Sequence, residues 1–559
     1  MKKGSVLIVD NVPEAIQPRQ DYLEAAGYQV LTATDPGTAK AILTDSWLHL
    51  AIVDIRLVDD FDERDFSGLD LVKATDPVIP KIVLTNYPTW EAVREALGPN
   101  VEGIPPAAYF LSKGDGLEAL LSAVEQTFQT HVCFNPDLEI VFDHPWTSFA
   151  CSVSLIESEQ EIGPRLTERV AEMTDLFRKL FCDRQKIIIR QMPQGRGGTV
   201  VVRVHPISEA GEEAQLVVKC GRRESVRQEI ECYDQFINPL TRNWSTQKVN
   251  TAETLHYGAV AYTLVGGFLE ETERLTEFYH NTSETTAICQ IMDHLFGDTC
   301  RLWLQSKARV ANRPLADQYA ERLGLSTGAQ REKLHQRSAR LYDKEAGRGL
   351  GWIERHKEEL IFHFGPNHTL TLPDPIGFAF RSSHPALRQP ALERVGHGDL
   401  NSDNVLVDQR GYTWLIDFQH TQQWPVLADF AELEGVITFE LVQTRNLDQL
   451  YALEKHLLTP VTFDEPMPES DDLPPDLRKA QAVIGHLRRR ANQVAGADMQ
   501  QYLVGLLFHA LRQVSAAGGL APDQERSPDA HQLHAMLAAA MIAYRLHNWD
   551  EKWPGWPDE

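Results

Sequence analysis

With 559 residues, the chain is too long for one hydrophobic core, so two or three domains are expected. Its hydrophobic content of 43% and its charged content of 24% are those of an ordinary globular protein. The formal net charge of -25 argues against nonspecific binding to nucleic acid or to an anionic membrane, because those surfaces attract clustered Lys and Arg.

Short apolar runs alternate with amphipathic stretches over residues 1–127. This alternation is typical of βαβ units and predicts an N-terminal α/β domain with a doubly wound parallel sheet. Polar functional groups are then expected at the carboxyl ends of the strands. The predicted strands are Ser5–Val9, Gln29–Thr32, His49–Val53, Lys81–Thr85 and Ala107–Leu111, and the predicted helices include Pro13–Ala26 and Pro36–Thr44.

Three further parts follow after a break near residue 128. Residues 128–184 are predicted to be a connector with a helical lead-in, residues 185–270 a small strand-rich lobe, and residues 271–559 a larger, mostly helical lobe with a helical insertion. The predicted strands are Lys186–Ile189, Thr199–Val204, Gln215–Cys220 and Ala259–Val265, with strand pairs near His368–Phe380 and Val405–Phe418. The predicted helices are Pro164–Phe181, Arg223–Phe236, Gln501–Val514 and His531–Leu546, with the insertion over Leu304–Phe364.

Four polar residues end or follow predicted strands of the first domain: Asp10, Asp54, Thr85 and Lys113. A carboxylate at a strand end can attack a phosphoryl donor, and a second carboxylate helps to hold the Mg²⁺ that neutralises the phosphate oxygens. A hydroxyl and an ammonium group can bind the acyl phosphate once it has formed. Each residue alone could simply cap a helix, but the four together predict a phospho-acceptor site.

These residues resemble the receiver domain of two-component response regulators, a flavodoxin-like fold, over about residues 1–127. The resemblance implies Asp54 as the phospho-acceptor and Asp10 and Asp54 as Mg²⁺ ligands. It also implies Thr85 as the switch hydroxyl, Lys113 as the phosphate-binding lysine and Phe110 as the aromatic switch. The implied partners are a sensor histidine kinase or a small phosphodonor, and a second copy of the chain in a homodimer through the receiver.

Three positions depart from the receiver pattern. Asn11 replaces one carboxylate of the usual acidic pair, so weaker metal binding is expected. The segment DDFDERD lengthens the loop between Asp54 and Gly68, and Gly114 replaces the usual proline. These departures keep open a second role for the domain, in dimerisation or partner choice without phosphorylation.

The strongest motif in the second half is HGDLNSDNVLVD at residues 397–408, followed by WLIDF at residues 414–418. Phosphoryl transfer needs a base or orienting group for the acceptor, metal ligands, and a cation on the phosphates. Asp399 suits the first task, and the oxygens of Asn404 and Asp417 suit Mg²⁺. A loop that merely happens to contain His, Asp and Asn is the alternative, but it would not require this spacing or the strand that follows.

Two features of the same motif are structural. His397 is predicted to hold the loop rather than to react. The stretch VLVDQRGYTWLID predicts a β-hairpin that turns at Gly411. The hairpin is expected to bring Asp417 back beside Asn404.

Upstream residues supply the remaining parts of a phosphoryl-transfer site. Lys219 ends the apolar run AQLVVK, and a strand there would direct its side chain toward phosphates. Glu229 lies in the next predicted helix, where it could pair with Lys219. A solvated strand edge is the alternative for a lone lysine. Gly195, Gly197 and Gly198 form a turn that could approach phosphates through backbone N–H groups, although any hairpin can use glycines.

This set resembles the aminoglycoside-phosphotransferase and choline-kinase superfamily over about residues 185–550. The resemblance implies a two-lobed, protein-kinase-like α+β domain with ATP and Mg²⁺ as cofactors. The chain has HGD where protein kinases have HRD, and Asp-Phe-Gln where they have DFG. In VLADFAELEG, the resemblance implies that Asp429 fixes the catalytic loop. The order of WLIDF, LADFAELE and a leading receiver also resembles the bacterial ternary complex-associated domains.

Two hypotheses of function remain open. The first is a two-component-type bacterial signalling protein whose receiver controls an ATP-dependent phosphotransferase, acting on an unknown hydroxyl or amine acceptor. The second is a scaffold whose kinase-like domain binds nucleotide without turnover. The receiver argues against a third, antibiotic resistance proper, because a drug-modifying enzyme needs no phospho-input.

The expected compartment is the cytoplasm. The seven cysteines are scattered and form no C-x-x-C pair, which fits reduced thiols and argues against a zinc or redox site. The N-terminal apolar run ends at Asp10, and no apolar stretch is long enough to span a bilayer.

Overall fold

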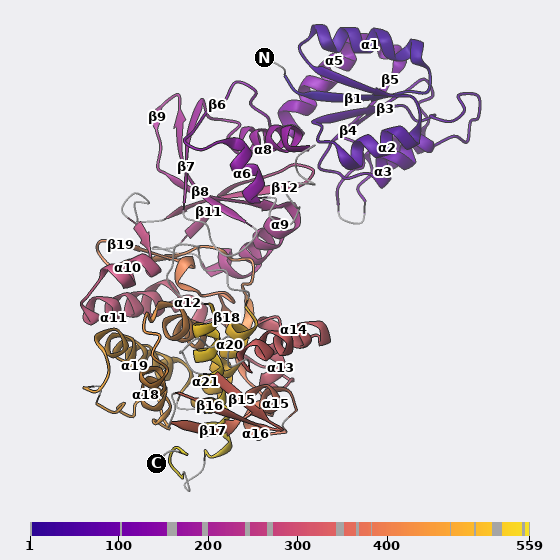
Figure 1. Ribbon diagram of the computed structural model, residues 1–559. Helices are drawn as coiled ribbons and strands as arrows, with labels where there is room; N and C mark the ends of the chain where they lie inside the picture. The colour runs from indigo at the N-terminus through magenta and orange to yellow at the C-terminus, as the bar shows by residue number, and fades with distance from the viewer. Residues whose placement is uncertain are drawn as a thin grey trace. The chain divides into compact units, whose positions relative to one another are not determined.

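The computed structural model divides into two compact units (Figure 1). The first contains Met1–Gln228 and Gln247–Thr263, and the second contains Glu229–Thr246 and Leu264–Glu559. The structure describes residues 3–100, 103–153, 165–192, 199–240, 246–264, 272–342, 352–364, 368–381, 383–469, 471–496, 499–516, 528–549 and 554–557. Among these residues, no helix combines the length and the low polarity needed to cross a membrane.

The N-terminal part is a five-stranded, fully parallel sheet in the order β2-β1-β3-β4-β5. This is the flavodoxin-like strand order, so the predicted doubly wound fold is confirmed. In Figure 1 the strands lie between α1 and α5 on one face and α2 and α3 on the other. Its elements are β1 Ser5–Val9, α1 Pro13–Ala25, β2 Gln29–Ala33, α2 Pro36–Asp45, β3 Leu50–Val53, α3 Ser67–Ala74, β4 Lys81–Thr85, α4 Trp90–Leu97, β5 Tyr109–Ser112 and α5 Gly116–Thr127.

Separate apolar cores fill the two faces of this sheet. Alternate residues of each strand point to opposite faces, so Leu7 and Val9 pack with α2, α3 and α4, while Val6 and Ile8 pack with α1 and α5. Such strands are buried on both sides, which explains their near-continuous apolar sequences.

A second sheet of seven strands follows in the same unit, in the order β11-β12-β10-β8-β7-β6 with β9 paired to β8. Strand β6 pairs in parallel with β7, so the segment predicted as a connector supplies an edge strand, and the boundary drawn at residue 185 does not separate two folds. Its apolar residues pack with α6 and α8 in one core. The elements are β6 Glu139–Phe142, α6 Trp146–Val153, α8 Leu166–Leu180, β7 Lys186–Gln191, β8 Val200–Ser208, β9 Gly211–Glu212, β10 Leu216–Arg222, β11 Thr246–Glu253 and β12 Tyr257–Leu264, together with α9 Arg223–Cys232, whose residues from Glu229 onward belong to the second unit.

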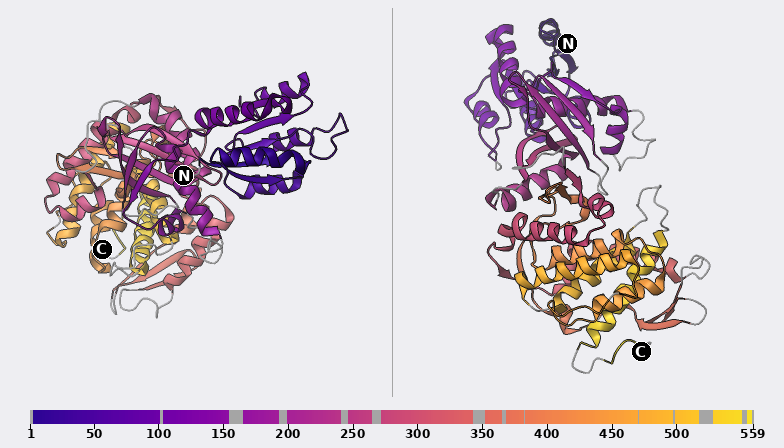
Figure 2. Two further views of the ribbon diagram at one scale, coloured as in Figure 1. Left: turned by 90° about the horizontal axis from the view of Figure 1, so that it is seen from above. Right: turned by 90° about the vertical axis from the view of Figure 1, so that its left-hand side faces the viewer.

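The second unit is mostly helical and contains three small sheets, β13-β19-β20, β14-β18-β21 and β15-β16-β17. Helices α20 and α21 pack against each other at the yellow end of the chain (Figure 2). The elements are β13 Thr272–Arg274, α10 Leu275–Asn281, α11 Thr285–His294, α12 Arg301–Leu304, β14 Arg309–Val310, α13 Leu315–Arg322, α14 Gly328–Ser338, β15 Trp352–His356, β16 Glu359–His363, β17 Thr369–Pro373, α15 Pro375–Arg381, α16 Pro385–Arg388, β18 Leu392–Gly396, β19 Val405–Asp408, β20 Thr413–Leu415, β21 Gln422–Pro425, α17 Ala428–Val436, α18 Leu447–Leu458, α19 Pro475–Ala495, α20 Met499–Ser515 and α21 Pro528–His547.

Two predictions for this unit are wrong. The insertion over residues 304–364 is not purely helical, because it ends in the hairpin β15–β16, whose strands pair from Trp352 with His363 to His356 with Glu359. The strand pair predicted near residues 368–380 is one strand, β17, followed by helix α15. Apolar and polar residues alternate with period two in WIERH and ELIFH, which is the pattern of a half-buried strand. The apolar positions Ile353, Leu360 and Phe362 are the buried ones.

Candidate functional sites

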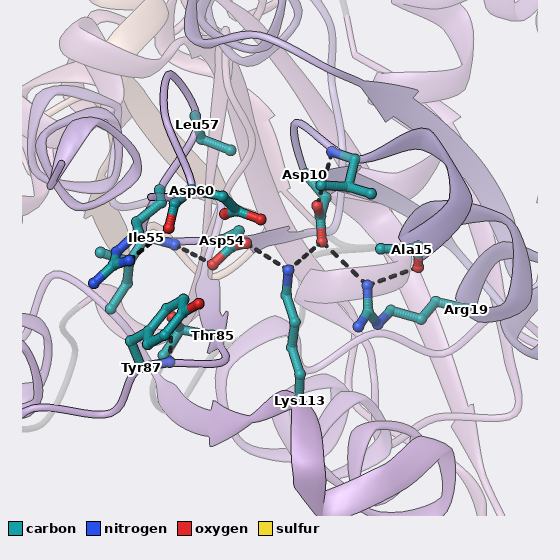
Figure 3. Close-up of polar contacts among 12 residues, drawn as sticks. Asp10, Ala15, Arg19, Asp54, Ile55, Leu57, Asp60, Thr85, Tyr87 and Lys113 are labelled. Carbon is teal, nitrogen blue, oxygen red and sulfur yellow. Dashed lines mark hydrogen bonds and ion pairs between the residues drawn. The ribbon is translucent and has the colours of Figure 1, made fainter. Parts of the chain in front are cut away.

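The receiver site is defined here as Asp10, Asp54 and Lys113, which follow β1, β3 and β5 at one edge of the parallel sheet (Figure 3). The Lys113 Nζ lies 2.7 Å from Asp10 Oδ2 and 2.5 Å from Asp54 Oδ2. The Asp54 Oδ1 accepts a hydrogen bond of 2.7 Å from the backbone N–H of Ile55. Three residues far apart in the sequence therefore form one cluster, as the strand pattern predicts.

Asp54 is buried, and burial raises its pKa above the usual range although the Lys113 ammonium acts in the opposite direction. Thr85, at the end of β4, is fully buried, and its Oγ1 accepts a hydrogen bond of 3.1 Å from the backbone N–H of Tyr87. Phe110 is half-buried in β5 and packs against the core formed with α2, α3 and α4. The switch roles of Thr85 and Phe110 stay predictions.

The lengthened loop after Asp54 is held by its own polar groups. The Asp65 Oδ2 accepts hydrogen bonds of 2.9 Å from the backbone N–H groups of Val58 and Asp59. At the end of the loop, a Cβ on Gly68 would lie 1.7 Å from the carbonyl oxygen of Asp54. The loop therefore returns onto the phospho-acceptor strand so closely that only glycine fits there.

Two further residues at the receiver site bear on metal binding. Arg19, which the sequence analysis missed, places its Nη1 3.1 Å from Asp10 Oδ2. The Oδ1 of Asn11 is buried and has no hydrogen-bond partner among the described residues. Carboxylate and amide oxygens suit Mg²⁺, so the donor set of Asp10, Asp54 and Asn11 fits the cation that the fold implies.

The HGD loop, residues 397–404, connects β18 to β19 in the second unit. The Asn404 Nδ2 donates to the backbone oxygen of Asp399 at 2.8 Å and to its Oδ2 at 3.2 Å, and the Asn401 Nδ2 donates to the same Oδ2 at 3.2 Å. Burial, followed by the charges of Glu432 and Asp417, raises the pKa of Asp399 above the usual range. A carboxylate with a raised pKa is a stronger proton acceptor once it is ionised.

The hairpin β19–β20 has the predicted form. Val405 pairs with Leu415, and Gly411 occupies the turn with a φ of 86°. The backbone N–H of Ile416 donates to the backbone oxygen of Asn404 at 3.1 Å, so the hairpin brings the residue before Asp417 onto Asn404. Because Nδ2 of Asn404 faces Asp399, its Oδ1 is the atom that can ligate a metal ion.

Asp417 has a φ of 71°, in the left-handed region that is uncommon for a residue with a Cβ. Such strained positions are frequent at functional sites. The oxygens of Asn404 and Asp417 suit Mg²⁺ by their chemistry. Among the described residues, no group of three or more His, Cys, Asp or Glu side chains could hold a metal ion.

Two carboxylates of α17 hold the HGD loop through its backbone. The Asp429 Oδ2 accepts from the N–H of His397 at 2.7 Å, and its Oδ1 accepts from the N–H of Gly398 at 3.2 Å. The Glu432 Oε2 accepts from the N–H of Leu400 at 2.9 Å. Asp429 thus has the geometry expected of a residue that fixes the loop, and Glu432, one helical turn later, holds the N–H of Leu400 further along the same loop.

Arg322, at the end of α13, neutralises both carboxylates. Its Nη2 lies 2.9 Å from Asp429 Oδ1 and also contacts Glu432, and its side chain is fully buried. Although burial acts in the opposite direction, Arg322 and His397 lower the pKa of Asp429. Glu432 could have been found from the AELE sequence, three residues after Asp429. No sequence pattern around Arg322 indicates a role at the HGD loop, because Arg322 is far from the loop in the sequence and is brought to it only by folding.

His397 and Gly398 have structural positions. The His397 Nε2 lies 3.1 Å from the Ile416 carbonyl oxygen, and the ring stacks on Trp303. Gly398 has a φ of 84°, and a Cβ there would lie 2.1 Å from the carbonyl oxygen of His420. The HGD sequence therefore needs glycine at its centre for steric reasons.

The remaining predicted residues divide between the two units. Lys219 is buried in β10 of the first unit, and Glu229 is buried in the part of α9 that belongs to the second. The backbone N–H of Phe418 donates to Glu229 Oε1 at 3.3 Å. The pairing of Lys219 with Glu229 stays a prediction. The predicted phosphate turn of Gly195, Gly197 and Gly198 lies outside the described residues.

Within the first unit, the receiver contacts the second sheet region from the amino-terminal edge of its strands, opposite the edge that carries Asp54. The Trp47 Nε1 donates to Asp175 Oδ2 at 3.1 Å, and His49 Nε2 lies 3.3 Å from the same oxygen. Asp76 forms an ion pair of 2.5 Å with Arg223, the first residue of α9. Helix α9 continues from there to Glu229.

Comparison with known proteins bears on each unit. A model of the family described as ternary complex associated domain 9 matches residues 184–349 and 346–515, more than half of the chain. No curated protein matches the chain. The receiver part is similar to the structure of a CheY-like response regulator receiver domain protein from Methanospirillum hungatei JF-1, with 25% identity and a TM-score of 0.20, covering 23% of this chain and 94% of that one.

Two further solved structures are similar to the same part of the chain. One is a response regulator from Thermotoga maritima, with 21% identity, and the other is the receiver domain of NtrX from Brucella abortus, with 24% identity. Each has a TM-score of 0.19 and covers 22% of this chain and 98% of its own.

Proposed function

The chain belongs to the family with ternary complex associated domain 9, and we propose that its receiver controls an ATP- and Mg²⁺-dependent phosphotransferase within this family region. The proposed acceptor is a hydroxyl or amine compound, or a protein side chain with such a group. The receiver takes its phosphoryl group from a sensor histidine kinase or a small phosphodonor, in the cytoplasm of a bacterium.

The observation that carries the proposal is the geometry of the HGD loop. Asp399 is held by Asn401 and Asn404 with its pKa raised, and the hairpin brings Ile416, the residue before Asp417, onto Asn404. In the proposed reaction, the ionised Asp399 accepts the proton of the acceptor group and orients it toward the γ-phosphate. Mg²⁺ bound with ATP would neutralise the phosphate charge, and the oxygens of Asn404 and Asp417 are the residues to hold it.

A nucleotide-binding scaffold is the second candidate. The hydrogen bonds from Asn401 and Asn404 satisfy Asp399 inside its own loop, and a purely structural carboxylate would have the same partners. The two candidates differ in turnover, since a scaffold would bind ATP without forming ADP.

Asp417→Ala is expected to abolish the dependence of ATP binding on Mg²⁺ and to weaken binding at saturating Mg²⁺. The reason is the loss of one of the two proposed oxygen ligands. Calorimetric titration of ATP with Mg²⁺ or with a chelator measures both effects. Asp298→Ala, which removes a half-exposed carboxylate elsewhere in the second unit, is the matched control and should behave as wild type. ATP binding that is independent of metal and unchanged in Asp417→Ala would refute the proposed site.

Regulation is proposed to pass through α9. Asp76 of the receiver pairs with Arg223 at one end of this helix, and Glu229 further along accepts from the backbone next to Asp417. A change in the receiver that moved Asp76 would therefore act on the helix that carries Glu229. A receiver that only mediates dimerisation remains the alternative, and it predicts no effect of Asp54 on turnover.

A further inference from the structure

Two side-chain cations meet one carboxylate at the receiver site. Arg19 on α1 donates from Nη1 to Asp10 Oδ2 at 3.1 Å and to the backbone oxygen of Ala15 at 2.6 Å. Lys113, the first residue after β5, contacts the same Asp10 oxygen (Figure 3). The Arg19 side chain is only 13% exposed and that of Asp10 only 2%, so water screens this ion pair weakly.

The charges at the site balance without a metal ion. Asp10 and Asp54 contribute two negative charges, and Lys113 and Arg19 contribute two positive charges. The affinity of an oxygen site for a divalent cation rises with the net negative charge of its ligands. Asn11, which stands in place of a carboxylate, adds an oxygen without a charge.

We propose that Arg19 competes with Mg²⁺ for Asp10 and thereby sets the metal affinity of the receiver. Asp10 can ligate the cation fully only after the guanidinium has left its Oδ2. Asn11 Oδ1, which is buried without a partner among the described residues, is then the next oxygen available to the cation. The inference rests on the proposed phospho-acceptor role of the receiver site, and it adds a residue that the strand-end pattern does not contain.

The test is a calorimetric Mg²⁺ titration of the full chain without nucleotide, in an Asp417→Ala background so that the second proposed metal site does not contribute. Arg19→Gln removes the charge and keeps a polar side chain on α1. We expect it to bind Mg²⁺ several-fold more tightly, which corresponds to the loss of one modest ion pair. Arg94→Gln, at an exposed arginine on α4, should leave the affinity unchanged. Equal or weaker Mg²⁺ binding by Arg19→Gln would overturn the proposal.

A second measurement uses the wild-type residue. The side-chain NMR signal of Arg19, assigned by its loss in Arg19→Lys, should shift on Mg²⁺ saturation as the guanidinium leaves Asp10. An Arg19 signal unchanged at saturating Mg²⁺ would contradict competition even if Arg19→Gln does not fold. Phosphorylation of Asp54 is measured in a separate experiment with a small phosphodonor. Tighter Mg²⁺ binding without any phosphorylation would reject the phospho-acceptor role and leave the competition intact.

Discussion

Asp399→Asn is expected to keep the fold and ATP binding but to lower turnover by at least the roughly 10²–10⁴-fold that a general base contributes. The amide is the same size and can still meet the side chains of Asn401 and Asn404 after a flip, so the loop keeps its packing. What it loses is the ability to accept a proton. ADP formation across a panel of hydroxyl and amine acceptors measures the rate, and calorimetry measures ATP binding.

Asp403→Asn is the matched control for this change. Asp403 lies in the same loop and accepts a hydrogen bond of 2.7 Å from Thr276, away from Asp399. The same substitution there should leave turnover within a small factor of wild type. Equal turnover in Asp399→Asn and wild type would remove Asp399 from the mechanism. The absence of ADP formation by wild type with every acceptor and with water would favour the scaffold.

Arg322→Met is expected to destabilise the second unit by about 3–5 kcal/mol, the usual cost of removing one partner from a buried ion pair. The substitution leaves Asp429 and Glu432 as neighbouring carboxylates in the interior without their cation. Both also bind backbone N–H groups of the HGD loop, so the loop should lose order together with stability. Urea denaturation followed by tryptophan fluorescence measures the effect.

Arg313→Met separates this effect from the loss of any arginine. Arg313 pairs with Glu321, and its side chain is 45% exposed, so the change should cost less than about 0.5 kcal/mol. An Arg322→Met variant as stable as Arg313→Met would mean that the buried network does not hold the HGD loop.

The receiver fold and its site could be predicted because their signals are local. Each strand is a short apolar run, and each functional residue follows a strand directly, so parallel pairing alone brings Asp10, Asp54 and Lys113 together. The β19–β20 hairpin is local in the same sense, with Gly411 between two apolar runs. In both places a prediction of the secondary structure is enough to predict which residues lie close together.

The remainder depends on contacts between distant segments. Arg322 lies 107 residues before Asp429, and nothing near Arg322 in the sequence marks it as a partner of a loop. Strand β6 has only four residues, and it is stabilised as a strand by pairing with β7 more than forty residues later. Arg19 reaches Asp10 because α1 packs against the sheet, so the helical pattern of its own segment gives no indication of a site.

Control of the phosphotransferase by the receiver is tested most directly by one measurement. ADP formation by the full chain is compared with and without a small phosphodonor and Mg²⁺, in wild type and in Asp54→Ala. We expect phosphorylation of Asp54 and a several-fold to hundredfold change in turnover, the range given by coupling energies of about 1–3 kcal/mol, and we expect Asp54→Ala to abolish this change. If Asp54 is not phosphorylated, or if turnover responds to the phosphodonor equally in both proteins, the receiver does not control the phosphotransferase.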